Sequence, residues 1–229
     1  MNLQDIIGPV MVGPSSSHTA GAARIGRVAF KLLGEPVAHA DITLHGSFHT
    51  TGKGHGTDKA IVAGLMGFKV DDPRIPESFA AAKEAGLTYR FLHADLGAEV
   101  HPNTAKLAMK GKSGKEMTVV AASVGGGRIH VTELDGLAVS FSGDLPTLVI
   151  HHMDQPGKIA EVATLLERKK INVASMRLYR ARRGGNAVMV FECDQEVPAS
   201  DVQWLSEQEA TVRVIYLSQS RAGGAAVHV

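Results

Sequence analysis

The strongest constraint on the fold is a regular alternation of strand and helix patterns in the last third of the chain. The expected elements are a strand at 147–152, a helix opened by Pro156, strands at 172–180 and 186–193, a helix at 200–208 and a strand at 212–217. The first helix has an apolar stripe that includes Val162 and Leu166, and Ser200 is the expected N-cap of the second. Residues 182–185 favour a hairpin. This βαββαβ order is typical of the ferredoxin-like fold.

The first two thirds of the chain predict a separate α+β region with a mostly antiparallel sheet. Helices are expected at 17–33, 58–67 and 77–85, and strands at 37–46, 88–93, 104–110, 116–124, 127–133 and 137–141. Residues 51–57 have a glycine at every second position and are expected to form a loop, with Thr57 capping the helix that follows. We therefore expect one domain at 1–143, a second at 147–219 and a flexible tail at 220–229.

Composition is that of a soluble globular protein and argues against several classes of function. Hydrophobic residues make up 44% of the 229 residues and charged residues 21%, while the formal net charge is only +1. That charge gives no global attraction to nucleic acid or an anionic membrane. No apolar window of about 18 residues is present, and the N-terminus lacks the basic and apolar regions of a signal peptide. A cytoplasmic location is expected.

The single cysteine, Cys193, limits the redox and metal chemistry of the chain. One thiol cannot close an intrachain disulfide, and an iron–sulfur cluster normally needs several thiolates. The histidines form no HExxH or similar zinc pattern, so no metal ligands are predicted in this chain. Residues 125–127 and 52–57 lack the setting or spacing of nucleotide-binding loops, and no G-x-S-x-G hydrolase elbow is present.

Three segments carry a resemblance to known families. Gly13-Pro-Ser-Ser-Ser-His-Thr19 and Thr51-Gly-Lys-Gly-His-Gly-Thr-Asp58 resemble, in order and separation, the β region of bacterial iron–sulfur L-serine dehydratases. The segment from Leu148 to Ala160, with the Ile-Asn-Val-Ala-Ser run that ends at Ser175, resembles an ACT domain. The resemblance implies a β chain that works with an α chain holding a [4Fe–4S] cluster. The first region also resembles the allosteric substrate-binding domain of some phosphoglycerate dehydrogenases.

The resemblance implies an L-serine ammonia-lyase, which converts L-serine to pyruvate and ammonia. This reaction needs a base for the Cα proton and an electrophile for the hydroxyl, a role that an iron of the cluster plays in the family. His55 stands at the position of the family's proposed base, and an unperturbed histidine pKa near 6.5 suits proton transfer. Asp58 is expected to orient the imidazole. The alternative is that His55 only caps a helix start.

Substrate contacts are expected mainly from the hydroxyl-rich segment at the start of the first helix. Free N–H groups and the helix dipole favour a carboxylate there, although a plain N-cap run is the alternative. Lys53 is the nearest fixed positive charge to His55. His101 and Asn103 resemble a His-x-Asn element of the family's substrate site, with His101 grouped with the catalytic residues. The expected substrate-binding residues are Ser15, Ser16, Ser17, His18, Thr19, Lys53 and Asn103.

The ACT resemblance implies a small amino acid as effector, bound between two subunits. Asp154 is expected to meet its ammonium, N–H groups near Gly157 its carboxylate, and Asn172 is a further contact position. The alternative is an ACT domain used only for assembly. An exposed sheet edge makes pairing of two ACT domains an expectation in either case.

Three functions remain open at the level of sequence. The chain is a catalytic subunit, or a serine-sensing regulatory subunit without chemistry, or a stand-alone amino-acid-binding protein. His55 discriminates the first two, since a sensor needs no base aimed at Cα. The preference for serine over threonine, the ACT effector, any monovalent cation and the subunit count are not determined by the sequence.

Overall fold

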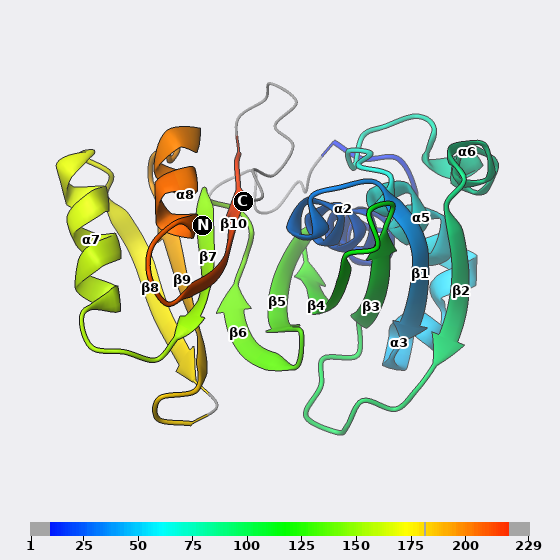
Figure 1. Ribbon diagram of the computed structural model, residues 1–229. Coiled ribbons are helices and arrows are strands. Elements are labelled where there is room, and N and C mark those ends of the chain that lie inside the picture. The colour runs from blue at the N-terminus through cyan, green and yellow to red at the C-terminus, as the bar shows by residue number, and fades with distance from the viewer. Residues whose placement is uncertain (1–9, 181, 220–229) are drawn as a thin grey trace. The chain divides into compact units, whose positions relative to one another are not determined.

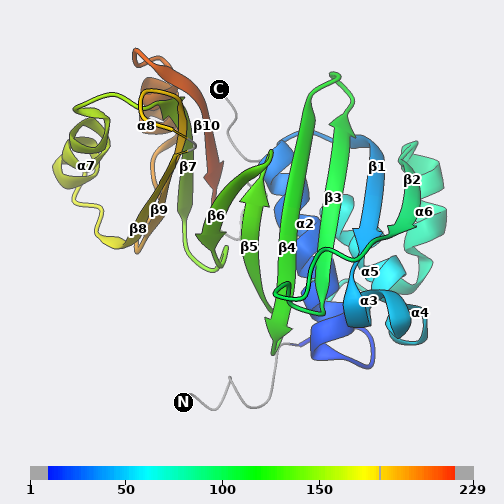
Figure 2. The ribbon, with the colours of Figure 1, turned by 90° about the horizontal axis from the view of Figure 1, so that it is seen from below.

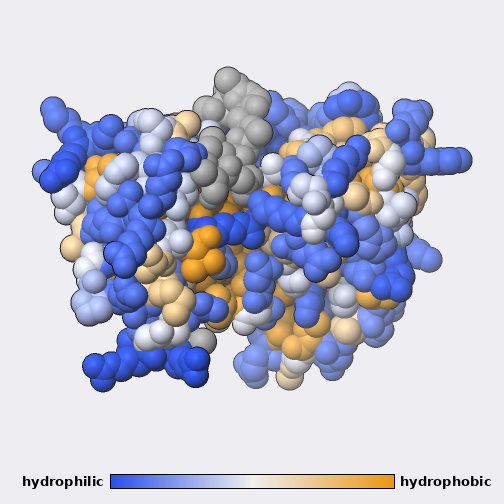
Figure 3. Space-filling view, in the orientation of Figure 1, coloured by the Kyte–Doolittle hydropathy of each residue, from blue (hydrophilic) through white to orange (hydrophobic). Residues whose placement is uncertain are grey.

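The computed structural model describes residues 10–180 and 182–219, which form two compact units, Met1–Asp135 and Gly136–Val229. Both units combine helices with a β-sheet (Figure 1), so the expected α+β class is confirmed. Hydrophilic residues predominate on the face shown in Figure 3. Within the described ranges, no helix has both the length and the apolar content that crossing a membrane requires.

The first unit is built on five strands of a six-stranded sheet of order β2-β1-β3-β4-β5-β6, whose last strand, β6, follows the boundary at Asp135. The strands are β1 (Val37–Leu44), β2 (Thr88–His93), β3 (Thr104–Gly111), β4 (Glu116–Gly125), β5 (Arg128–Leu134) and β6 (Leu137–Phe141). β1 pairs in parallel with β2 and antiparallel with β3, and β3, β4 and β5 continue antiparallel. Helices lie on one face of this sheet (Figure 2). They are η1 (Ser16–Gly21), α2 (Ala22–Leu33), α3 (Gly46–Thr50), α4 (Gly52–His55), α5 (Thr57–Leu65), η2 (Ile75–Glu77) and α6 (Ser78–Ala85).

Two glycines bring helices α2 and α5 into backbone contact. A Cβ built on Gly26 would lie 2.4 Å from the Ile61 carbonyl oxygen, and one on Gly64 would lie 2.2 Å from the Ala23 carbonyl oxygen. Real Cβ atoms do not approach a backbone oxygen so closely, so only glycine permits this crossing. The crossing joins the first half of α2 to the last turn of α5 and so fixes the two helices relative to each other.

The start of the first helix differs from the expectation of one helix over 17–33. Ser16–Gly21 forms a π-helical turn, and the regular α-helix begins only at Ala22. A Cβ on Gly21 would lie 2.0 Å from the hydroxyl of Ser123, a residue of β4 with no exposed surface. The glycine therefore lets this turn approach the sheet closely. π-turns are rare and frequently occur at functional sites.

The expected loop at 51–57 is wrong, because this segment contains the short helix α4. Its preceding neighbour α3 ends at Thr50, and Gly56 follows with a left-handed φ of 69° that separates α4 from α5. Glycine adopts this conformation without a steric cost, which explains how two helices follow each other here. Thr57 is not an N-cap but the first residue of α5, and its hydroxyl donates instead to the His18 carbonyl.

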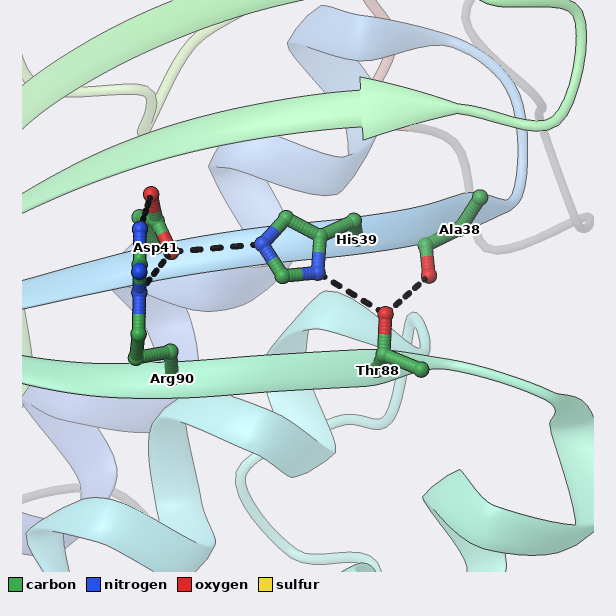
Figure 4. Close-up of polar contacts among 5 residues, drawn as sticks. All are labelled: Ala38, His39, Asp41, Thr88 and Arg90. Atoms are coloured by element: carbon green, nitrogen blue, oxygen red, sulfur yellow. Dashed lines mark hydrogen bonds and ion pairs between the residues drawn. The ribbon is translucent and has the colours of Figure 1, made fainter.

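Strand β2 is an edge strand, and a polar network on β1 fixes its position (Figure 4). The Arg90 guanidinium donates to both carboxylate oxygens of Asp41 at 2.9 and 2.6 Å, which lowers the pKa of that carboxyl. His39 bridges the Thr88 hydroxyl at 2.8 Å and the Asp41 carboxylate at 3.2 Å. These contacts hold the parallel register of β2 from its first residue, and β2 continues to His93.

The second unit has the ferredoxin-like order that the sequence predicted. Its four-stranded sheet runs β10-β7-β9-β8, and two helices lie on one face of it (Figure 1). A single apolar core, which includes Val162, Phe191 and Leu205, joins helices and sheet. Ser200 lies inside its helix rather than capping it, since Pro198 occupies the cap position. The elements are β7 (Thr147–Met153), α7 (Lys158–Arg168), β8 (Val173–Arg180), β9 (Asn186–Cys193), α8 (Ala199–Ser206) and β10 (Thr211–Leu217).

Candidate functional site

The hydroxyl-rich segment forms a chain of side-chain hydrogen bonds at the π-turn. The Ser15 hydroxyl accepts from the His18 backbone N–H at 3.1 Å and contacts the Ser17 hydroxyl at 3.3 Å. Ser17 in turn contacts His18 Nδ1 at 3.2 Å. Ser15 is therefore the N-cap of this turn, as the N-cap alternative predicted.

His18 links this segment to α3. Its Nε2 lies 3.0 Å from the Thr51 hydroxyl and 3.1 Å from the Ser47 hydroxyl. Because the Thr51 hydroxyl donates its one proton to the Ser47 carbonyl at 2.9 Å, its oxygen is left to accept from His18 Nε2–H. Nδ1 of a neutral His18 then accepts from Ser17. Burial lowers the pKa of His18 most, and the neighbouring His55 lowers it further, so the neutral form is favoured.

His55 is exposed and oriented for proton transfer. Its Nδ1 lies 3.0 Å from the Thr51 carbonyl oxygen, which can only accept, so Nδ1 carries the proton and Nε2 has the lone pair. The His55 ring centre lies 5.0 Å from that of His18. A Cβ on Gly54 or Gly56 would meet nothing within 4 Å, so the space beside His55 is open. In a neutral imidazole this tautomer has its acceptor at Nε2, as a general base requires.

Two threonines lock the two motifs together through the backbone. The Thr19 hydroxyl donates to the His55 carbonyl, and the Thr57 hydroxyl donates to the His18 carbonyl, each at 2.9 Å. Both threonines are buried. Each motif thus holds the backbone of the other motif's histidine, although 36 and 39 residues separate the partners. Thr19 was expected to bind substrate, but its hydroxyl is committed to this structural bond.

Lys53 and Asp58 do not join the histidine cluster. Both line a cavity of about 340 Å³, and His55 is not among its lining residues in the described part of the chain. Asp58 accepts from the Lys59 backbone N–H at 2.8 Å, while the Thr51 carbonyl holds the His55 imidazole. The expectation that Asp58 orients His55 is therefore wrong in this structure.

His101 and Asn103 lie in a turn against α3. The Phe48 backbone N–H donates to the Pro102 carbonyl at 3.3 Å, which places the turn beside the helix that carries Ser47. The Asn103 backbone N–H donates to His101 Nδ1 at 3.1 Å, and this is an ordinary local turn bond. The structure brings the turn next to the site, but within the described residues neither His101 nor Asn103 bonds to His18 or His55.

The three expected ACT residues separate into two groups. Asp154 accepts from Arg180 Nη1 at 3.0 Å and from the Gly184 backbone N–H at 3.1 Å, which lower its pKa, and Gly157 precedes α7 in the same loop. Asn172 instead donates to Asp194 at 2.6 Å, at the opposite end of β8. Eight strand residues span about 25 Å. One copy of the chain therefore cannot place all three around one small ligand.

The residues of this chain do not fit an iron–sulfur cluster. No group of three or more potential metal ligands occurs within residues 10–180 and 182–219. The thiol of Cys193 is fully buried in the second unit, and burial raises its pKa to about 11, so it is held as the neutral thiol rather than the ligating thiolate.

Sequence reasoning missed Ser47 and the two functions of Thr51. Ser47 lies 29 residues from His18, in a helix that was not expected and that begins at the last residue of the expected strand 37–46. Thr51 begins the second motif, and its hydroxyl and carbonyl contact the two histidines separately. The sequence did offer one indication of the Thr51 contact. Thr51 lies four residues before His55, and residues with this spacing are hydrogen-bonded neighbours in a helical turn.

Comparison with known proteins identifies the family of each part. The family model described as "Serine dehydratase beta chain" matches residues 5–133, and the model described as "ACT domain" matches residues 147–206. The chain is 39% identical over 196 residues to "L-serine dehydratase, beta chain" of Peptoniphilus asaccharolyticus, covering 86% of this chain and 88% of that one. It is 43% identical over 210 residues to "Probable L-serine dehydratase, beta chain" of Bacillus subtilis (strain 168), covering 92% and 94%.

A more distant match is to a different enzyme. The chain is 33% identical over 93 residues to "D-3-phosphoglycerate dehydrogenase" of Methanocaldococcus jannaschii, which is 41% of this chain and 18% of that enzyme. The full-length matches and the family model decide the assignment: the chain belongs to the serine dehydratase beta chain family and carries a C-terminal ACT domain.

Proposed function

We propose that this chain supplies the general base and the carboxylate contacts for the conversion of L-serine to pyruvate and ammonia, together with an iron–sulfur α chain. The observation that carries the proposal is the hydrogen bond from His55 Nδ1 to the Thr51 carbonyl, which places the acceptor of a neutral imidazole at Nε2 of an exposed side chain. The beta-chain relatives support an α partner, because a beta chain is named as one part of an assembly.

In this proposal His55 Nε2 removes the Cα proton of L-serine. The electron pair of the broken C–H bond forms the Cα=Cβ double bond, and the hydroxyl leaves Cβ. The aminoacrylate released then tautomerises and is hydrolysed to pyruvate and ammonia. A [4Fe–4S] cluster in the α chain would supply the Lewis acid for the departing hydroxyl, since the described residues of this chain offer no ligands for one.

The substrate carboxylate is assigned to the segment of Ser15, Ser16 and Ser17 at the start of the first helix. Serine hydroxyls and free N–H groups at a helix start favour an anion. His18 is favoured as neutral imidazole, so it acts as a hydrogen-bonding group and not as a second cation. His101 and Asn103 are kept as further contacts beside α3. Ser47 and Thr51 position His18.

The ACT domain is proposed to bind a small amino acid between two copies, or to serve assembly alone. The domain limits of 1–143 and 147–219 are part of this proposal. The observation that favours a two-copy ligand site is the separation of Asp154 and Asn172 by the length of β8.

The test is anaerobic co-purification with a candidate α chain, followed by pyruvate release from L-serine. His55→Ala is expected to assemble normally and to lower kcat by about 10²- to 10⁴-fold, the range of general base catalysis. His39→Ala is the matched control, since His39 lies on β1 and its side chain bonds to Thr88 and Asp41, not to the cluster. If His55→Ala keeps full activity, the base assignment is wrong and a sensing subunit is the better description.

A further inference from the structure

The cavity lined by Lys53 and Asp58 has the mixture of apolar and polar lining residues that is typical of a small-molecule site. It lies between α3, α4, the start of α5 and the edge strand β2, and its volume is about 340 Å³. Much of its wall is apolar, with Phe48 fully buried and Phe91 and Leu92 more than a third exposed. Ligand sites typically combine such an apolar wall with a few polar groups.

The polar groups of this cavity are two charges of opposite sign and a pair of imidazoles. Lys53 is exposed, and in the described part of the chain no ion pair holds its ammonium. Asp58 uses one carboxylate oxygen for the Lys59 N–H, and the other oxygen remains for a further donor. His49 and His93 stack at 3.7 Å between ring centres, which closes one wall with flat rings.

We propose that this cavity binds a zwitterionic α-amino acid with an apolar side chain, at a site separate from the His55 cluster. Lys53 pairs with the ligand carboxylate, Asp58 with its ammonium, and Phe91 and Leu92 contact its side chain. Serine is a poorer match, since its short side chain would leave the apolar surface of Phe91 and Leu92 uncovered. The proposal goes beyond the function proposed above, because ligand binding here is independent of serine chemistry.

The position of the cavity suggests what its occupation would control. Lys53 and His55 belong to the same four-residue helix α4, yet Lys53 faces the cavity and His55 faces His18. Gly56 ends this helix in a left-handed conformation and directly precedes the helix that carries Asp58. A ligand held by both charges would therefore fix α4 on its cavity side and so fix His55. The cavity is thus a regulatory site for the base.

The test is calorimetric titration of L-leucine and L-phenylalanine into the assembled enzyme. Saturable binding of either probe is expected, and Lys53→Met and Asp58→Asn should each weaken it at least about 10-fold, as loss of one charge-assisted bond predicts. With L-leucine, the analogue 4-methylpentanoate, which lacks the ammonium, should bind more weakly to the wild-type enzyme. Asp58→Asn should remove that difference between the two probes.

Two controls separate this site from the others. Asp154→Asn should leave L-leucine binding unchanged, which excludes the ACT domain as the binding site. L-Serine should fail to displace L-leucine competitively. The proposal is overturned if neither probe binds saturably, if Lys53→Met and Asp58→Asn bind like the wild type, or if serine competes. Because binding is read without turnover, a failure here is distinct from a failure of His55→Ala to lose activity.

Discussion

The two units place their candidate ligand residues in opposite ways. In the first unit, hydroxyls and imidazoles from segments far apart in sequence meet in one copy of the chain, and backbone bonds from Thr19 and Thr57 hold them. In the ACT unit, Asp154 and Asn172 stand at opposite ends of a single strand, each already bonded to neighbours. The first arrangement is organised by the fold of one chain, whereas the second needs another copy to bring its parts together.

This difference shows that the separation of two residues along the chain is a poor guide to whether their side chains share a site. Lys53 and His55 are two residues apart and face different sites, while His18 and Thr51 are 33 residues apart and share a hydrogen bond. What brings residues together is the crossing of α2 and α5 and the short helices at its end. The comparison can be tested by disrupting each unit separately.

The largest effect is expected from Gly64→Val in the first unit. The added side chain meets the Ala23 carbonyl and the backbone of Arg27, so the unit should lose about 3 kcal/mol of unfolding free energy. Circular dichroism in urea should show an earlier transition. Fluorescence of Trp204, the only tryptophan, reports on the ACT unit. Gly54→Ala is the control, since its Cβ would meet nothing within 4 Å. Equal stability of both variants would contradict the crossing.

A smaller effect is expected from Thr51→Val in the histidine cluster. The variant keeps the carbonyl that holds His55 but loses the hydroxyl between His18 and Ser47. We expect kcat for pyruvate release to fall about 10-fold, which corresponds to about 1.4 kcal/mol in the barrier. Thr50→Val provides a matched control, because the neighbouring Thr50 is exposed. A fall of the same size in both variants would show that helix packing, and not the hydroxyl, is responsible.

The ACT unit can be tested by complementation. Asp154→Asn and Asn172→Ala should each abolish the change in activity that an effector amino acid causes, with little change in activity without effector. When equal amounts of the two mutant chains are mixed and reassembled at random, half of the pairs contain one chain of each kind. Each such pair regains both native residues at one of its two sites, so about a quarter of the effector response should return. No recovery on mixing would mean that one copy holds the whole site, against the geometry of β8.

The smallest effect concerns the pH dependence that His18 contributes. Its pKa is lowered in the folded protein, chiefly by burial, from the usual 6.5. The unfolded chain therefore binds more protons as the pH falls below 6.5, and the folded state loses stability over that range until the folded pKa is reached. His18→Gln should flatten this slope in urea titrations followed by circular dichroism. A slope unchanged by the substitution would contradict this contribution.

Much of the fold was predictable because apolar periodicity marks long elements well. The strands and helices of the ACT unit follow the expected order, since each buries a regular stripe such as Val162 and Leu166 in one core. The segments around 16–21 and 51–57 were not predictable. Their conformations depend on contacts at a distance, such as Gly21 against Ser123, and on glycine conformations that leave no periodic signal.

For the candidate site, sequence could indicate His18 and His55 but not how they are held. The orienting group of His55 is a backbone carbonyl, which every residue has and no motif reveals. The contact of Ser47 with His18 could not be predicted for a different reason, because it depends on how α3 packs in the folded chain. Lys53 and Asp58 show the reverse error, in which closeness along the chain was taken for closeness to the base.

The glycine crossing of α2 and α5 has a consequence for how this family can diverge. Gly26 and Gly64 each face the backbone of the opposite helix, and a backbone cannot be made smaller by any substitution. A larger residue at one of the two positions therefore clashes with backbone atoms, and no substitution at the other position can relieve that clash. Neither glycine is expected to be replaced by a series of neutral single substitutions. Divergence that keeps this crossing is expected to accumulate around the two glycines and not through them, so they record ancestry more faithfully than the histidines they support.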